Sequence, residues 1–194
     1  MRSLQASDLM TLEEYHKARI EFRAKVLAHK KDRQVSIGPN MTLYFEDWLT
    51  IKYQVQEMLR IERIFESEAI EEELNAYVPL IPDGSNFKAT FMIEFPDPAV
   101  RHRELAQLIG VEDKVYIQAS GYDRVYAIAD EDLERANEEK TSAVHFLRFE
   151  LDPEMVKGLK NSVDISFGIT HPNYQYSVRK LPETVRAALV ADLV

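Results

Sequence analysis

The stretch YFEDWLTIKYQVQEMLRIERIFESEAIEEEL, which runs from Tyr44 to Leu74, decides the fold. Its apolar residues recur with the spacing of a helix, in which each residue advances about 100° around the axis. One broad arc carries Trp48, Ile51, Val55, Met58, Leu59 and Phe65, and the opposite side carries Lys52, Gln56, Arg60 and Arg63. This pattern is typical of a helix that lies on a hydrophobic core. We therefore predict a long helix here, with an interruption near Ser67.

Three polar residues lie within the apolar arc of this helix. Glu62 follows Val55 by seven residues and therefore lies within ~20° of it on the helix. Gln54 falls on the same arc, and Glu66 stacks beside Glu62 one turn later. A buried carboxylate without a partner is costly in free energy. We therefore expect Glu62 to have a cationic partner or to line a hydrated cavity.

An earlier helix, expected to begin near Ser7 or Asp8, carries complementary charges. Arg19 and Arg23 fall inside its apolar arc, and His16 lies next to them. We infer that the two helices meet at these positions. Their polar residues then form one predicted cluster, made of His16, Arg19, Arg23, Gln54, Glu62 and Glu66.

This cluster has two interpretations. The first is a pocket for an anionic small molecule, in which the arginines supply fork-shaped donors and Glu62 serves as a general base. The second is a structural network of ion pairs between the helices or across a dimer seam. We favour the second interpretation, because structural networks also perturb ionisable groups.

The second half of the chain changes to the period of a strand. Every second residue from Phe87 to Phe95 is apolar, and strand-like runs return at 115–119, 124–129, 144–151, 163–170 and 174–179. This order predicts an α+β fold, in which a helical N-terminal half packs on one face of a mostly antiparallel sheet of about five or six strands. We expect one domain over residues 1–194. Residues 33–46, which contain the turn signal Gly38-Pro39-Asn40, are expected to form a hairpin or an oligomerisation arm.

Composition limits the classes of function. The 194 residues carry a net charge of −9, which disfavours broad binding to nucleic acid or to anionic membranes. The sequence contains no cysteine, so it excludes disulfides, a thiol nucleophile and a cysteine-ligated iron–sulfur cluster. No run approaches the roughly 20 apolar residues that span a bilayer, and we expect no signal peptide. These features predict a cytoplasmic protein that binds neither nucleic acid nor membrane.

Metal and loop motifs are sparse. Glu13-x-x-His16 has the spacing that four-helix di-iron proteins use twice, but the motif occurs once here, so we expect no metal site and no cofactor. His171, Asn173 and Tyr174 lie in the loop between the last two strands and are secondary candidates for a site. The simpler interpretation of this loop is a β-turn, because Pro-Asn is turn chemistry.

Short motifs spread over most of the chain carry a family resemblance. They are Ile37-Gly38-Pro39, Phe45-Glu46, Gln56-Glu57-Met58, Leu80-Ile81-Pro82 and His171-Pro172-x-Tyr174. In these motifs the chain resembles an uncharacterised bacterial family that is known only as a domain of unknown function. Members of that family are often encoded near rubrerythrin-like and iron–sulfur oxidoreductase genes. The resemblance therefore implies a cytoplasmic accessory role in redox or oxidative-stress metabolism, and it transfers no catalytic residues.

Two functions follow from these observations. The first is an accessory or interaction protein that forms a homo-oligomer, in the simplest case a homodimer, and works with a redox protein partner. The alternative is a binding protein or an enzyme for an anionic small molecule, which would use the predicted cluster.

Overall fold

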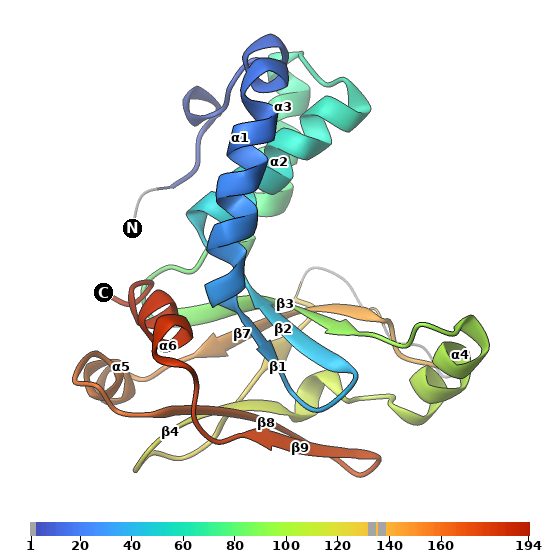
Figure 1. Cartoon of the computed structure of the whole chain (residues 1–194), viewed down its shortest axis with the longest axis vertical. Coiled ribbons are helices and arrows are strands. Elements are labelled where there is room, and N and C mark those ends of the chain that lie inside the picture. The colour runs from blue at the N-terminus through green and yellow to red at the C-terminus, as the bar shows by residue number, and fades with distance from the viewer. Residues whose placement is uncertain (1–2, 132–134, 136–138) are drawn as a thin grey trace.

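The computed structural model describes residues 3–131, 135 and 139–194 and shows three layers (Figure 1). Two antiparallel sheets pack face to face, and α1, α2 and α3 form a helical layer that projects from the outer side of one sheet (Figure 1). No helix in this described part of the chain combines the length and the apolar character that crossing a membrane requires. The helices are α1 (Leu12–Lys30), α2 (Trp48–Glu62), α3 (Ser67–Tyr77), α4 (Pro98–Gln107), α5 (Pro153–Lys160) and α6 (Glu183–Val190). Short 3-10 helices are η1 (Ala6–Asp8), η2 (Lys31–Arg33), η3 (Val78–Leu80) and η4 (Glu112–Lys114).

The strands divide between two sheets, in which every neighbouring pair is antiparallel. Sheet A has the order β1 (Gln34–Ser36), β2 (Met41–Phe45), β3 (Asn86–Ile93), β7 (Val144–Glu150) and β6 (Ile128–Ala129). Sheet B has the order β5 (Val125–Tyr126), β4 (Val115–Ala119), β8 (Ile165–His171) and β9 (Tyr174–Val178). The predicted α+β fold is confirmed, although two sheets stand where the sequence predicts one.

The main hydrophobic core lies between the sheets. Every second residue of β3 from Phe87 to Ile93 is buried in it, as the alternation predicts. Phe167 of β8 packs there against Phe45 of β2, with ring centroids 5.2 Å apart. Alternate residues of a strand point to opposite faces, so the residues between them, Lys88 among these, point to the outer face of sheet A. Alternation reveals that one face is buried, but it does not reveal that a second sheet covers it.

The helical layer has its own hydrophobic cluster, and the predicted long helix is two helices. Asp47 and Thr50 form a reciprocal capping box at the start of α2, with N–O distances of 2.8 and 2.9 Å. α2 ends at Glu62, where Arg63 takes a left-handed φ of 57°, and α3 begins at Ser67. The predicted interruption near Ser67 is therefore present. The cluster comprises Leu4, Ile51, Val55, Leu59, Leu74 and Ile81.

Residues 33–46 contain the hairpin β1–β2 at one edge of sheet A. Val35 and Leu43 are partners across the hairpin, and both are buried in the main core. The segment therefore forms the predicted hairpin and belongs to the sheet. Its use as an oligomerisation arm stays a prediction.

Candidate functional site

A cavity lies between the outer face of sheet A and the η3 segment that follows α3. Its larger part has a volume of ≈ 440 Å³, and its smaller part has a volume of ≈ 210 Å³. Both parts are lined by Glu46, Leu80 and Phe146, so they adjoin each other. Small-molecule sites have this form, in which a few polar groups converge on mainly apolar walls. We call the two parts together the sheet A cavity.

Two cations lie side by side on the wall of the larger part. Lys88 on β3 and Arg148 on β7 are directly opposite each other in the antiparallel register, and both line the cavity. Directly opposite side chains have Cβ atoms about 4.5–5.5 Å apart, and like charges at such positions destabilise a sheet. The sheet therefore places two positive charges next to each other at one point of the cavity.

Two glutamates neutralise Arg148. Its Nε and Nη2 donate to the two carboxylate oxygens of Glu131, each over 2.8 Å, and its Nη1 donates to Glu150. The hydrogen bonds to Glu131 above all raise the pKa of Arg148, and the same bonds lower the pKa of Glu131. Glu131 also lines the cavity. One planar edge of the guanidinium therefore already holds a carboxylate at the cavity wall.

Lys88 connects the sheet to the η3 segment above it. Its Nζ donates to the backbone oxygens of Pro79 and Ile81 over 2.7 and 3.0 Å. Burial lowers the pKa of Lys88. An ammonium group has three donors, so beyond these two bonds the third can serve a ligand in the cavity.

Glu46 lies where the two parts of the cavity meet. Its two oxygens accept hydrogen bonds from the hydroxyls of Thr50 and Thr90, over 2.6 and 2.7 Å. Each carboxylate oxygen can accept a further bond. Gln54, one of the predicted site residues, lines the smaller part together with Lys30. The smaller part therefore offers both acceptors and donors to a bound molecule.

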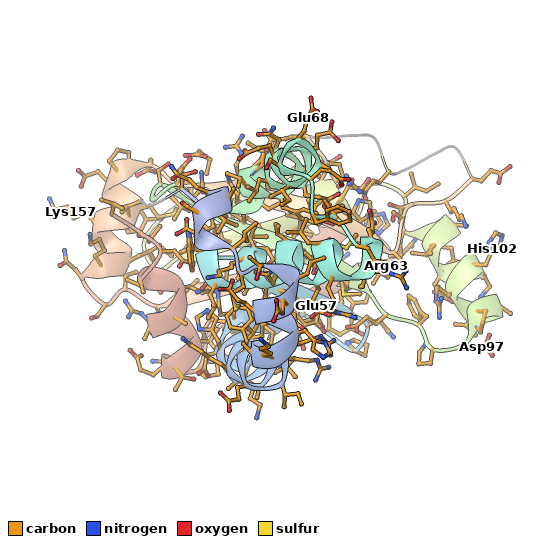
Figure 2. All side chains as sticks on the ribbon, turned by 90° about the horizontal axis from the view of Figure 1, so that it is seen from above. Glu57, Arg63, Glu68, Asp97, His102 and Lys157 are labelled. Atoms are coloured by element: carbon orange, nitrogen blue, oxygen red, sulfur yellow. The ribbon has the colours of Figure 1, made fainter. Side chains whose placement is uncertain are left out.

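The predicted contact between the first two long helices is present, but its carboxylate is Glu57. Arg19 donates to Glu57 through Nε over 2.7 Å and through Nη2 over 2.9 Å. The Tyr15 hydroxyl donates to the same carboxylate over 2.5 Å, and Arg60 donates over 3.1 Å. The hydrogen bond from Arg19 above all lowers the pKa of Glu57 to about 2. Figure 2 shows Glu57 where α1 crosses α2, in an arrangement that joins the helices.

The other members of the predicted cluster lie on the surface. His16, Arg23, Glu62 and Glu66 are exposed. The predicted burial of Glu62 is wrong because α2 ends there and the helical phase does not continue beyond it. Burial, followed by the negative charge of Glu62, raises the pKa of Glu73 on α3. Glu62 therefore lies close to another acid, and the six residues do not form the predicted cluster.

The loop candidates fasten the β8–β9 turn to neighbouring backbone. The Tyr174 hydroxyl donates to the Ile37 carbonyl over 2.7 Å and accepts from the Asn40 amide over 3.1 Å. His171 and Asn173 contact carbonyl groups at the end of α4 over 3.2 and 2.8 Å. These contacts favour the interpretation of the loop as a structural turn. The motif at Ile37 and the motif at Tyr174, far apart in sequence, meet here.

His145, a buried histidine that the sequence does not single out, lies in a polar network of its own. His145 Nδ1 lies 2.5 Å from Asp130 Oδ2, and His145 Nε2 lies 2.9 Å from the Thr141 hydroxyl. The order Asp–His–Thr is that of an activated nucleophile. However, Thr141 is buried and its hydroxyl donates to Glu112 over 3.1 Å. The chain is therefore best explained as an interior structural network.

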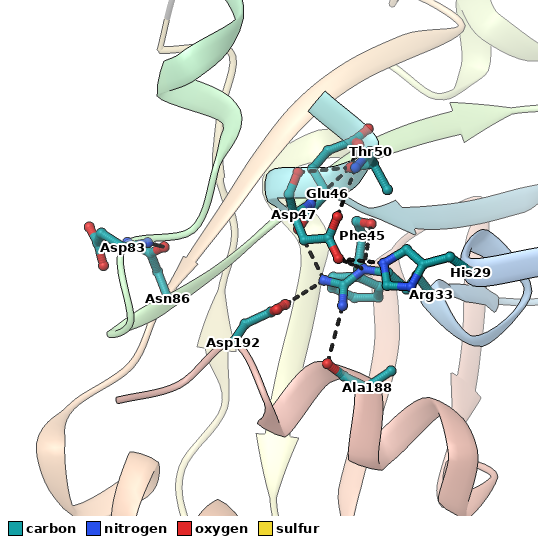
Figure 3. A network of polar contacts seen from close by, with 10 residues as sticks. All are labelled: His29, Arg33, Phe45, Glu46, Asp47, Thr50, Asp83, Asn86, Ala188 and Asp192. Carbon is teal, nitrogen blue, oxygen red and sulfur yellow. Dashed lines mark hydrogen bonds and ion pairs between the residues drawn. The ribbon is translucent and has the colours of Figure 1, made fainter. Parts of the chain in front are cut away.

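Arg33 forms a third network, which joins three elements (Figure 3). Arg33 is 3% exposed, and its guanidinium donates to the carbonyls of Phe45 and Ala188 over 3.2 and 3.1 Å. It also forms ion pairs with Asp47 and Asp192. The network joins the end of the first helix to the start of α2 and to the C-terminal α6. Because Arg33 is buried and bonded to protein groups on all sides, its role is structural.

Sequence reasoning missed Lys88 and Arg148. Each occupies an outward position of an alternating strand, where a charged residue is ordinary. The informative signal is the register that places them opposite each other. Periodicity within one strand does not reveal its register with another strand.

Comparison with known proteins identifies relatives of the whole chain. A family model with the description "Protein of unknown function (DUF3501)" matches residues 3–193. A crystal structure of a "novel protein of unknown function" from Burkholderia pseudomallei K96243 is 50% identical, covers 100% of both chains and has a TM-score of 0.94. No curated protein matches the chain. These relatives support the fold and name no activity.

Proposed function

We propose that this chain, which belongs to the family described as "Protein of unknown function (DUF3501)", binds an anionic small molecule in the sheet A cavity. The observation that carries the proposal is the pair formed by Lys88 and Arg148. Two cations directly opposite each other on one sheet face reduce stability unless something compensates for them. Glu131 and Glu150 supply that compensation to Arg148, whereas Lys88 donates to two backbone carbonyls, so an anion at this wall of the cavity would complete the compensation at Lys88.

The walls of the cavity suit a molecule with an apolar part. Leu80 and Phe146 lie beside both parts of the cavity, and Pro79 lines the larger part. In a partly dehydrated site the attraction between a cation and an anion is stronger than in bulk water. An anionic group near Lys88 and Arg148 and an apolar body along Leu80 and Phe146 would therefore use both features of the cavity.

This proposal retains the class of ligand predicted from the sequence and moves the site. The sequence assigns the anion to Arg19, Arg23 and their neighbours. In the structure Arg19 is occupied by Glu57, and Arg23 is exposed. Of the predicted residues, Gln54 lines the sheet A cavity.

Thermal unfolding with a panel of acetate, hexanoate, benzoate and inorganic phosphate tests the proposal. A ligand at 100 times its Kd stabilises a protein by about 2.7 kcal/mol, which raises the midpoint measurably. We expect at least one anion to raise the midpoint of the wild type, and Lys88→Met and Arg148→Met to remove this effect. Arg103→Met is the matched control, because Arg103 pairs with Glu104 on the surface of α4. If no anion shifts the wild type, or if all three variants respond equally, the proposal is wrong.

A second function, the accessory role, rests on exposed apolar side chains of the helical layer. Ile20 on α1 is 83% exposed, and Phe65 in the turn between α2 and α3 is 71% exposed. Exposed apolar residues of this size mark interaction sites when they form a patch. These exposed side chains are compatible with a homo-oligomer or with docking to a redox protein partner. Calorimetric titration with a rubrerythrin-like protein of the same organism tests the redox partner, and absence of binding heat and of complex formation would contradict it.

A further inference from the structure

We infer, on the premise of the proposed function, that the ligand is a carboxylate whose head group takes the place of Glu131 on Arg148. In the structure Glu131 presents both oxygens to Nε and Nη2 of Arg148, each over 2.8 Å. This bidentate geometry is specific for the planar match between a guanidinium and a carboxylate. Glu131 thus marks the place and the chemistry of the ligand's anionic group.

Glu131 is the more easily displaced of the two glutamates on Arg148. Its side chain is 51% exposed, and among the contacts of the described residues its hydrogen-bond partner is Arg148. Glu150, in contrast, also accepts hydrogen bonds from Ser85 and Asn86 over 2.7 and 3.1 Å. Glu131 is held by Arg148 alone among these contacts and Glu150 by three side chains, so displacing Glu131 costs less than displacing Glu150. Glu150 would stay on Nη1 and keep the guanidinium oriented.

The position of Glu131 relative to the cavity indicates the rest of the ligand. Glu131 follows β6, which pairs with β7 at the edge of sheet A, and it lines the larger part of the cavity together with Leu147 and Phe146. A carboxylate in its place would have Lys88 beside it, whose third N–H can donate. The apolar part of the molecule would then extend along Leu80. The ligand class is therefore a small carboxylate with an apolar body.

Calorimetric titration with hexanoate, and separately with inorganic phosphate, tests this assignment. Glu131→Gln removes the competing charge, and because an exposed pair has a small effect we expect hexanoate to bind about twofold to fivefold more tightly. Arg148→Lys keeps the charge but removes the fork, and we expect binding to weaken about tenfold or more. Glu150→Gln is the comparison variant, because it removes a negative charge that pairs with Arg148 but does not line the cavity. We expect a smaller gain in hexanoate affinity than for Glu131→Gln. Thermal unfolding of each variant confirms that it is folded.

Each outcome separates this inference from the proposed function. If Glu131→Gln leaves the affinity unchanged while Lys88→Met abolishes binding, the cavity binds an anion and Glu131 does not occupy its place. Equal gains in Glu131→Gln and Glu150→Gln would show a general charge effect and would also overturn the inference. If phosphate binds and hexanoate does not, the ligand is not a carboxylate and the inference is wrong, while the proposal of an anion site in the cavity is retained. If neither anion binds to any variant, the proposed function and the inference both fail.

Discussion

Arg19 on α1 holds both carboxylate oxygens of Glu57 on α2, through Nε over 2.7 Å and Nη2 over 2.9 Å. The Tyr15 hydroxyl contacts the same carboxylate over 2.5 Å. The fully buried side chains of α1 are Tyr15 and Val26, and Phe22 packs its ring against Tyr53 of α2 with centroids 6.1 Å apart. The polar contact at Glu57 adds to this packing and connects α1 to α2.

Replacing Glu57 by Gln is expected to destabilise the protein by about 1–3 kcal/mol, because it leaves the donors of Arg19 and Tyr15 poorly satisfied. Chemical denaturation measures the loss. Lys17→Met is the control, since Lys17 pairs with Glu13 on the exposed side of the same helix and its loss should change stability by less than about 0.5 kcal/mol. Equal effects of the two substitutions would show that the Glu57 contact has no special role.

Glu57 also predicts a dependence on pH. Its pKa is lowered from the ordinary 4.5 to about 2, so it contributes stability above pH 4.5 that is lost as the pH falls toward 2. The free energy of unfolding of the wild type should therefore fall over this window, and that of Glu57→Gln should fall less. Denaturation at a series of pH values from 6 to about 2 measures both slopes. Parallel slopes would contradict the assignment.

The helical wheel predicts which helices meet and fails to predict which carboxylate they share. Arg19 lies on the side of α1 that faces α2, as its phase indicates. The wheel selects Glu62 because it assumes that the helix continues, whereas α2 ends at that residue with Arg63 in a left-handed conformation. Glu57 lies nearer the middle of the helix and outside its apolar arc, where a wheel cannot distinguish a solvated acid from a paired one.

Prediction of the sheet from sequence alternation has a similar limit. The alternation from Phe87 to Ile93 identifies the buried face of β3, and the structure confirms it. The pairing of Lys88 with Arg148 depends on the register between β3 and β7. These strands are separated by 50 residues of chain, so no local sequence pattern reveals their register. The cavity depends further on how η3 lies over the sheet. Candidate sites formed by such distant contacts cannot be read from one sequence.

Gly38 offers a sharp test of the contact between the β1–β2 turn and β9. Its φ is +73°, and a Cβ there would lie 2.5 Å from the Tyr174 hydroxyl and 2.6 Å from the Tyr176 ring. Gly38→Ala should therefore combine backbone strain with a steric clash and cost about 2–4 kcal/mol. Gly121→Ala is the control, because Gly121 has a similar φ of +87° and nothing within 4 Å.

The two glycine variants separate strain from packing. Gly121→Ala should lose about 1 kcal/mol from backbone strain alone. Urea denaturation of both proteins measures the difference. If Gly38→Ala loses no more than Gly121→Ala, the turn can move away from Tyr174, and the contact has little role in stability.

Arg33 is expected to be the most sensitive of the interior cations. Its side chain is almost fully buried between Asp47 and Asp192, so Arg33→Met would leave Asp192 without its cation and Asp47 with His29 as its remaining ion-pair partner. Breaking a buried ion pair in this way costs about 3–5 kcal/mol. Denaturation with guanidinium chloride measures the loss in free energy of unfolding. Arg33→Met combined with Asp192→Asn should recover part of it, and a double variant as unstable as the sum of the two single variants would contradict the coupling.

The exposed apolar residues of the helical layer predict where copies of the chain associate. Ile20 and Phe65 have most of their surface in solvent, and burial of such side chains contributes about 1.5–3 kcal/mol each. If the helical layer forms the predicted homodimer, Ile20→Glu with Phe65→Glu should change the mass in light scattering from two chains to one, with an unchanged fold by circular dichroism. Ile109→Glu is the control, because Ile109 is also partly exposed but follows α4, away from this layer. A wild type that is already one chain, or a dimer that survives the double substitution, would exclude this surface as the interface, because two buried glutamates would be too costly to tolerate there.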